Sequence, residues 1–227
     1  MTDPWQRLGA ALDAYAVVAP RDSRFRPAAC GHCHTAEELA ALAGPVESVP
    51  GRLLAAVAYR SPGHWSDPTA LLRRLAPRLM RAVVAGGQGV GAGSLGTRFR
   101  QADWPRWPEP ERVALLTLWR TWFDLTVRHD PAPVPVDEVL DLVATATGGL
   151  APWLDRWPAA GHPVADRRLA ELLDGWVVHD RADALRLGHG GEYLAGSELF
   201  TWLNGLDPAR LTPDQRYALA LLDADRP

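Results

Sequence analysis

The sequence contains no lysine and no isoleucine, and Asn204 is its only asparagine. All 24 basic residues are therefore arginine. The simplest explanation is a very GC-rich genome, because arginine, alanine, glycine and proline have GC-rich codons, and we attach no functional meaning to the missing lysines. The formal net charge is −3 and the isoelectric point lies near 6.2. No excess of basic charge indicates a nucleic acid or an anionic membrane as a partner.

Long apolar runs and targeting segments are also lacking. Nowhere do about 18 uncharged apolar residues follow one another, so we expect no membrane-spanning helix. The start, "MTDPWQRLGAALDAYAVVAPRD", shows neither a basic region nor an apolar core before a small-residue cleavage site. We therefore expect a cytoplasmic protein. Because that compartment is reducing, we expect no permanent disulfide between the two cysteines.

Signals of α-helices recur along the whole chain, whereas strand patterns are nearly absent. Asp3-Pro4 and Ser66-Asp67-Pro68 are typical helix starts, and Thr35-Ala36-Glu37-Glu38 matches a capping box. Pro77 lies inside the apolar pattern of the helix that follows Pro68, which predicts a kink or a restart there. The patterns predict an all-α protein of about ten helices packed as antiparallel hairpins. A degenerate helical-repeat (HEAT-like) solenoid is a more specific alternative, although no clean repeat of about 34 or 40 residues is visible.

A proline-rich connector, Pro131 to Pro135, is the best boundary between subdomains. We predict an N-terminal helical subdomain, residues 1–130, with both cysteines and a glycine-rich loop at residues 85–96. A C-terminal helical subdomain, residues 136–227, would share one continuous core with it. The segment "WPEPERVALLTLWRTWFDLTVRHD" is apolar nearly all round, which predicts a helix in the middle of that core.

Both cysteines lie in the motif Cys30-Gly31-His32-Cys33-His34. Two thiolates at this spacing bind one Zn²⁺ well, and His32 or His34 could supply a third ligand. A closed structural site needs four ligands, so the last would be a remote histidine such as His64 or a side chain of a partner. We therefore expect no cofactor unless this motif binds zinc. The favoured interpretation is simpler: both cysteines are small apolar side chains at a loop-to-helix junction, with the histidines exposed.

The same motif matches two other signatures. C-x-x-C-H is the attachment pattern of haem c, with His34 as axial ligand and Met80 as a sixth ligand, but this attachment is normally made outside the cytoplasm. C-G-H-C is a disulfide-exchange pattern, and a helix that starts just after Cys33 would lower the pKa of the first thiol. No thioredoxin-like strand precedes it, because "RDSRFRPAA" is polar and Pro27 interrupts it. A redox role would need an unrelated helical frame.

Two further motifs match known sites only in part. Gly91–Gly96 spells G-x-G-x-x-G, but a dinucleotide site needs a preceding strand, so we interpret this stretch as part of a mobile loop. The pairs His129-Asp130 and His179-Asp180, with Asp225, resemble the metal ligands of HD-type phosphohydrolases. Both pairs are expected at helix ends, where the helix dipole and the cap explain them. The balance is therefore against an enzyme.

The chain has ten tryptophans, most of which we expect in the core. Trp104 and Trp107 lie in the proline-rich stretch "ADWPRWPEP". If exposed, this pair and Arg106 between them would form an anchor for a partner protein. Filling of the core is the favoured interpretation of both indoles.

Residues from Cys30 to about Trp122 resemble an uncharacterised family of bacterial all-helical proteins. The matching pieces are "CGHC", "GHWSD" (Gly63–Asp67), "LAPRLM" (Leu75–Met80) and "WPRWPEPERVALLTLW" (Trp104–Trp119). The chain departs from the family where a "DFRHFLPR"-like segment is replaced by "DPTALLRRLAPR". The resemblance implies a helical fold and brings no known activity or catalytic residue.

A large helical frame without a convergent polar constellation favours binding over catalysis. We therefore predict a non-catalytic protein–protein interaction module, an adaptor or an immunity-like inhibitor, whose partner is another protein. The alternative is a metal-binding or thiol-redox protein centred on Cys30 and Cys33.

Overall fold

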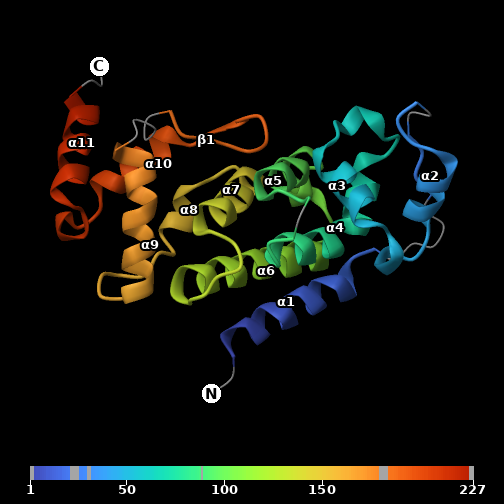
Figure 1. Ribbon diagram of the computed structural model, residues 1–227, viewed down its shortest axis with the longest axis horizontal. Coiled ribbons are helices and arrows are strands. Elements are labelled where there is room, and N and C mark those ends of the chain that lie inside the picture. Colours follow the sequence, from blue (N-terminus) through green and yellow to red (C-terminus); the bar gives the residue numbers. More distant parts are fainter. Residues whose placement is uncertain (1–2, 21–25, 30–31, 88, 179–183, 225–227) are drawn as a thin grey trace.

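The computed structural model describes residues 3–20, 26–29, 32–87, 89–178 and 184–224. These residues form eleven α-helices and one short pair of strands, which confirms the all-α class (Figure 1). The α-helices are α1 (Pro4–Val18), α2 (Ala36–Ala43), α3 (Gly51–Tyr59), α4 (Pro68–Val84), α5 (Ala92–Gln101), α6 (Glu109–Arg128), α7 (Val136–Thr147), α8 (Ala151–Leu154), α9 (Pro163–Leu173), α10 (Gly196–Asn204) and α11 (Pro213–Ala224).

Shorter elements connect these helices. Strands β1 (Arg186–Leu187) and β2 (Tyr193–Leu194) pair antiparallel, with Arg186 opposite Leu194. A π-helical turn, η4 (Asp174–Val178), continues α9. The 3₁₀ turns are η1 (Val46–Ser48), η2 (Pro62–His64), η3 (Trp104–Arg106) and η5 (Pro208–Arg210).

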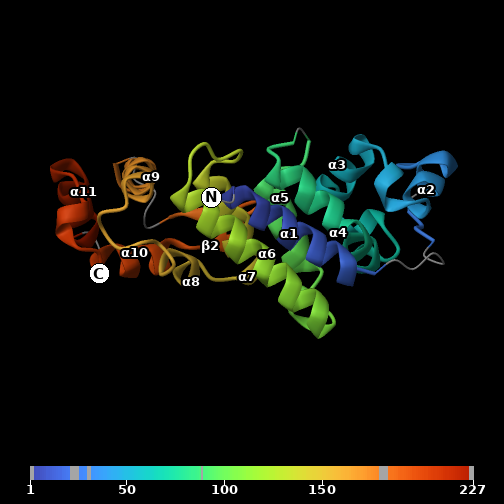
Figure 2. The ribbon, with the colours of Figure 1, turned by 90° about the horizontal axis from the view of Figure 1, so that it is seen from below.

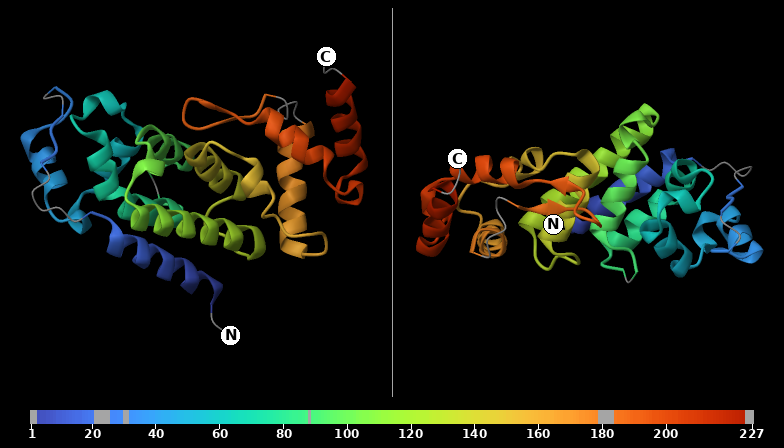
Figure 3. Two further views of the ribbon diagram at one scale, coloured as in Figure 1. Left: turned by 180° about the vertical axis from the view of Figure 1, so that it is seen from behind. Right: turned by 90° about the horizontal axis from the view of Figure 1, so that it is seen from above.

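The helices are arranged along one long axis, with α2 at one end of the molecule and α11 at the other (Figures 1 and 3). Helix α1 packs along α6 (Figure 2). The β1–β2 hairpin reaches from the C-terminal helices back towards α5 and α7 (Figure 3). The more specific arrangement as a helical-repeat solenoid stays a prediction.

The predicted helix starts are confirmed at three places. The Asp3 carboxylate accepts a hydrogen bond from the Trp5 N–H, and the Asp67 carboxylate accepts one from the Ala70 N–H. At α2 the Glu38 N–H donates to the Thr35 hydroxyl, and the Thr35 N–H donates to the Glu38 carboxylate. Each side chain satisfies a main-chain group that the first helical turn leaves without a partner.

Proline does not divide α4. The helix runs from Pro68 to Val84 with Pro77 inside it, so the restart that the sequence predicted does not occur. Proline removes one main-chain hydrogen bond from a helix interior. Leu75, Leu79 and Met80 are fully buried on the same helix, and this burial offsets the lost bond.

Helix α6 supplies several of the largest fully buried side chains. Leu115, Trp119, Trp122 and Phe123 are completely buried, as the apolar pattern predicted. The helix is not covered all round, however, because Val113 near its start is 57% exposed. Only the later turns of α6 therefore lie in the middle of the molecule.

The glycine motif belongs to a helix–helix contact. Helix α5 starts at Ala92, so only the first part of the predicted loop at residues 85–96 is a loop. Helix α5 makes its most extensive contact with α7. A Cβ atom on Gly96 would lie 2.6 Å from the Leu142 carbonyl oxygen, and one on Gly93 would lie 2.3 Å from the Asp141 carboxylate. Gly96 lets the two backbones approach closely, and Gly93 leaves room for the Asp141 side chain. These contacts explain the two glycines without a nucleotide.

One cluster of buried apolar residues extends from Leu8 in α1 to Leu219 in α11. The division into residues 1–130 and 136–227 stays a prediction. No helix in the described ranges is both long and apolar enough to cross a lipid bilayer.

Candidate functional site

The residues that flank the C-x-x-C motif are tied to the connection between α3 and α4. Ala29 and Trp65 form an isolated antiparallel bridge. The Ser66 N–H and hydroxyl both donate to the Ala28 carbonyl oxygen, at 2.8 and 3.0 Å. This pairing brings the motif next to η2, which ends at His64.

Cys33 and His64 are in direct contact. The Cys33 sulfur lies 3.4 Å from His64 Nδ1, and both residues are half-buried. Zn–S and Zn–N bonds of about 2.3 and 2.0 Å at a tetrahedral angle place two ligands about 3.5 Å apart. The observed separation therefore fits two ligands of one zinc ion, and it also fits a hydrogen bond between a thiol and an imidazole. His64 is the remote histidine that the sequence indicated as a ligand.

His34 supports this site from one side. Its buried ring packs on Trp65, with 4.3 Å between the ring centroids. His34 Nε2 lies 3.2 Å from Arg60 Nη1, and a guanidinium group only donates, so Nε2 must accept. His34 Nδ1 then carries the proton and faces the Glu38 carboxylate at 3.4 Å. Arg60 therefore engages Nε2, whereas Nδ1 has no hydrogen-bond partner of good geometry among the described residues. The role of His34 as a metal ligand stays a prediction.

Arg60 adds a positive charge beside the cysteine. Its Nη1 donates to the Cys33 carbonyl oxygen at 3.0 Å as well as to His34. A nearby cation favours the thiolate over the thiol, and the thiolate is the form that binds metals and reacts. A positive charge at this place therefore suits both zinc binding and thiol-redox chemistry at Cys33.

The described residues contain only part of the predicted ligand set. His32 is exposed, and Cys30 lies outside the described residues. Within the described part of the chain, no group of three or more His, Cys, Asp or Glu side chains is arranged to hold a metal ion. Cys33 and His64 are therefore the pair on which a metal interpretation depends.

Trp104 and Trp107 do not form an exposed anchor. Both are buried, which confirms that they fill the core. Trp104 Nε1 donates to the Ala146 carbonyl oxygen at 2.8 Å, and Trp107 Nε1 donates to the Ala102 carbonyl oxygen at 3.0 Å. Arg106 is exposed to solvent, and its one ion pair with a described residue is with Asp103. The hypothesis of a partner-binding tryptophan pair is wrong because both indoles find their partners inside the protein.

The other sequence motifs do not converge on a site. Met80, considered as a haem ligand, is fully buried in the core. The Asp130 carboxylate binds Arg167 and Arg168, and the Arg167 hydrogen bond is the main cause of its lowered pKa. His129 is the C-cap of α6, as expected for a helix end. The other HD-type residues, His179, Asp180 and Asp225, lie outside the described residues.

A second polar cluster, the hairpin-tip cluster, consists of Ser94, Thr97, Asp141, His189 and Glu192. His189 Nδ1 lies 3.0 Å from the Ser94 hydroxyl, and the His189 N–H donates to the Thr97 hydroxyl at 3.0 Å. The Thr97 hydroxyl donates to the Glu192 carboxylate at 3.1 Å. Ser94 and His189 are 95 positions apart, so no local pattern in the sequence could reveal the contact.

Asp141 anchors the same turn from α7. Its carboxylate accepts hydrogen bonds from the Gly188 N–H at 2.6 Å and from the Thr145 hydroxyl at 3.2 Å. Burial raises the pKa of Asp141 above its ordinary value. The Ser94 hydroxyl resembles an activated nucleophile, but Ser94 is only 5% exposed and a substrate would not reach it. The cluster holds the hairpin on α5 and α7.

Comparison of the chain with protein-family models, with curated proteins and with solved structures finds no match.

Proposed function

We propose that the protein binds one zinc ion through Cys33 and His64, with Cys30 and His32 of the C-x-x-C-H motif completing the ligand set. The observation that carries the proposal is the 3.4 Å contact between Cys33 Sγ and His64 Nδ1. These residues are 31 positions apart in the sequence. Cysteine and histidine are the usual protein ligands of zinc, and here they lie at the separation expected of two ligands of one ion.

The role of this zinc is structural. Helix α2 has eight residues, of which only Leu42 is buried, and η2 has no buried residue. At this end of the molecule, α2 and η2 themselves therefore contribute little apolar burial. A metal ion that joins the motif to η2 would stabilise it, because metal binding contributes directly to folding free energy. The interactions of His34 with Arg60, Glu38 and Trp65 orient the motif around the ion.

A thiol-redox function is the alternative that draws on the same contact. An imidazole next to Cys33, with the Arg60 cation nearby, lowers the free energy of the thiolate. Cys30, three positions earlier, would then be the partner thiol. In the zinc-binding function the sulfur atoms bind a metal ion. In the thiol-redox function they react directly with a thiol reagent.

Elemental analysis of the purified protein, combined with thiol titration, separates these functions. We expect about one zinc per chain and two thiols that react only after the metal is chelated. Cys33→Ser and His64→Ala should lose the zinc. His162→Asn is the matched control, because His162 caps α9 with its side chain and asparagine also caps helices. A protein that takes up no zinc and has two freely titrating thiols would refute the zinc proposal and support the redox alternative.

We also propose, as a second function, that the protein binds another protein, as an adaptor or an immunity-like inhibitor. The supporting observation is an apolar face on α11, where Tyr217 is 69% exposed and Leu221 is 50% exposed. These side chains are four positions apart and therefore share one face of the helix. Exposed aromatic residues are frequent anchors of protein interfaces.

The test is co-purification from the organism of origin. A Tyr217→Ser/Leu221→Ser variant should lose a stoichiometric partner that the original chain retains. Val113→Ser is the control, because Val113 is equally apolar and 57% exposed but lies on α6. Retention of the partner by the α11 variant would refute this assignment of the binding face.

A further inference from the structure

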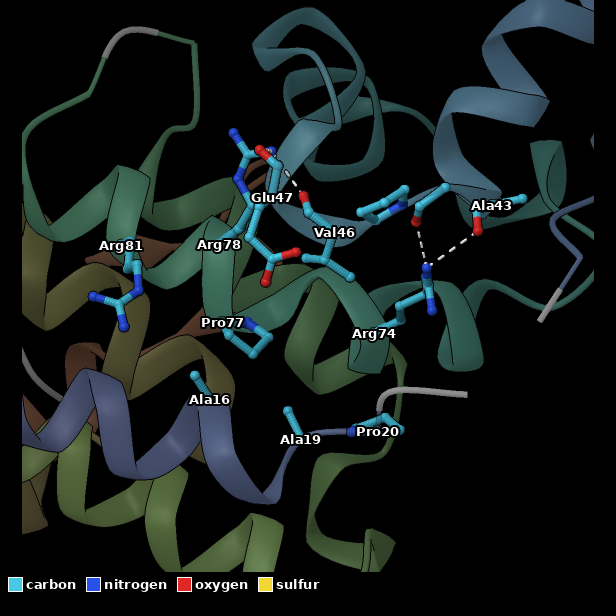
Figure 4. A pocket seen from close by; sticks show the side chains of 12 residues that line it. Ala16, Ala19, Pro20, Ala43, Val46, Glu47, Arg74, Pro77, Arg78 and Arg81 are labelled. Carbon is cyan, nitrogen blue, oxygen red and sulfur yellow. Dashed lines mark hydrogen bonds between the residues drawn. The ribbon is translucent and has the colours of Figure 1, made fainter. Parts of the chain in front are cut away.

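A cavity of about 770 Å³ lies on the side of α4 that faces the end of α1 (Figure 4). The segment between α2 and α3 forms its third wall. Its volume is within the usual range for small-molecule sites. The lining residues are Ala16, Ala19, Pro20, Ala43, Gly44, Pro45, Val46, Glu47, Arg74, Pro77, Arg78 and Arg81.

Three arginines of α4 dominate the charge of this cavity. Arg74, Arg78 and Arg81 are spaced by four and three positions, which places them along one face of the helix. Glu47 is the only carboxylate among the described lining residues. These described residues therefore carry a formal excess of two positive charges.

Neutral main-chain groups hold two of these arginines in place. Arg74 Nη2 donates to the carbonyl oxygens of Ala43 and Gly44, at 3.2 and 2.5 Å. These carbonyls end α2, where helical carbonyl groups lack partners in the helix. A carbonyl oxygen orients a guanidinium group without neutralising its charge.

Arg78 is held in the same way through a single nitrogen. Its Nη1 donates to three carbonyl oxygens at 2.7 to 2.8 Å, those of Val46, Glu47 and Val49. Among the hydrogen bonds made by described residues, none involves Nη2 or Nε of Arg78. A guanidinium group has five N–H donors, so most of them remain available on a group whose position is already fixed.

Arg81 is held less firmly than Arg74 and Arg78. It pairs with Asp13 on α1, but the two side chains are 45% and 72% exposed. An exposed pair of this kind is weak and exchanges readily with solvent ions. A ligand anion in the cavity can therefore compete for Arg81 at little cost.

We propose that this cavity binds a small organic anion. Its carboxylate or phosphate group would accept hydrogen bonds from Arg78 and Arg81, because planar guanidinium groups match both oxyanions. Its apolar body would lie on Ala16, Ala19 and Pro77. This site is separate from the Cys33–His64 pair and does not depend on zinc.

Calorimetric titration with four probes of similar size tests the proposal. Benzoate and phenyl phosphate carry the two oxyanions, whereas benzyl alcohol is neutral and benzylammonium is a cation. We expect saturable binding of at least one anion that weakens as salt is added, and no binding of the other two probes. Comparison of benzoate with phenyl phosphate then tells which oxyanion the cavity prefers.

Variants assign the binding to this cavity. Arg78 also holds the η1 segment, so its removal risks unfolding, and Arg81→Gln is the better choice. This variant should bind the anion about tenfold more weakly while its thermal unfolding is unchanged. Glu47→Gln should bind it about threefold more tightly, because a repulsive charge is removed. Arg106→Gln is the control, because Arg106 lies outside the cavity and its side chain is 86% exposed. This variant should bind the anion as tightly as the original chain does.

Three outcomes would overturn the proposal. The first is that neither anion binds saturably. The second is that benzyl alcohol binds as tightly as the anions, which would mean that the arginines do not contribute. The third is that Arg81→Gln and Glu47→Gln both bind the anion with unchanged affinity.

Discussion

Replacement of Gly96 by alanine tests the close approach of α5 and α7. The added Cβ would lie 2.6 Å from the Leu142 carbonyl oxygen and 3.0 Å from the Leu142 Cα, so the helices must separate. Overpacking of this kind costs about 1–3 kcal/mol, and alanine returns about 1 kcal/mol through its better helix propensity. We therefore expect the free energy of unfolding to fall by up to about 2 kcal/mol, and the melting temperature by up to about 6 °C.

Gly9→Ala is the matched control for this prediction. Gly9 also lies inside a helix, α1, but a Cβ there would have no atom within 4 Å. Only the gain in helix propensity remains, so this variant should melt about 2–4 °C higher than the original chain. Urea and thermal unfolding, followed by circular dichroism, measure both changes. If Gly96→Ala proves as stable as Gly9→Ala, the glycine motif does not serve helix packing.

Two further predictions concern Asp141 and the proline-rich tryptophan segment. Burial raises the pKa of Asp141, so the folded state holds this proton more tightly than the unfolded chain, and stability is lost as pH rises through the folded pKa. Asp141→Asn keeps an oxygen that can accept from the Gly188 N–H. It should therefore gain stability over the original chain at neutral pH but not in acid, as urea unfolding at several pH values will show; an advantage independent of pH would contradict this. Trp104→Ala should lower the free energy of unfolding by about 3–5 kcal/mol, whereas Arg106→Ala should change it by less than about 0.5 kcal/mol. Similar melting temperatures for these two variants would mean that Trp104 is not a core residue.

Local chemistry explains what could be predicted from the sequence. The caps at Asp3, Thr35 and Asp67 involve residues within three positions of one another, so a short stretch of sequence contains the whole interaction. The same is true of the apolar periodicity that placed Trp119 and Trp122 in the core. These local patterns are sufficient for the all-α class.

Contacts between distant segments could not be predicted in the same way. The Ser94–His189 contact depends on how the β1–β2 hairpin packs on α5, and no residue near either side chain encodes that packing. The glycines at 93 and 96 looked like a loop because glycine is common in loops. The structure explains them by α7, whose Asp141 side chain faces Gly93 and whose backbone at Leu142 faces Gly96, more than 40 positions away in the sequence. His64 was an exception, because the ligand chemistry of zinc indicated that a remote histidine was needed.

X-ray absorption at the zinc edge is the most direct test of the proposed Cys33–His64 zinc site. For protein purified under reducing conditions, we predict a zinc ion with sulfur ligands at about 2.3 Å and imidazole nitrogen at about 2.0 Å. His64→Ala and Cys33→Ser should bind no zinc and should therefore give no such spectrum. A spectrum with only oxygen and nitrogen around the zinc, or protein without bound zinc, would contradict the assignment.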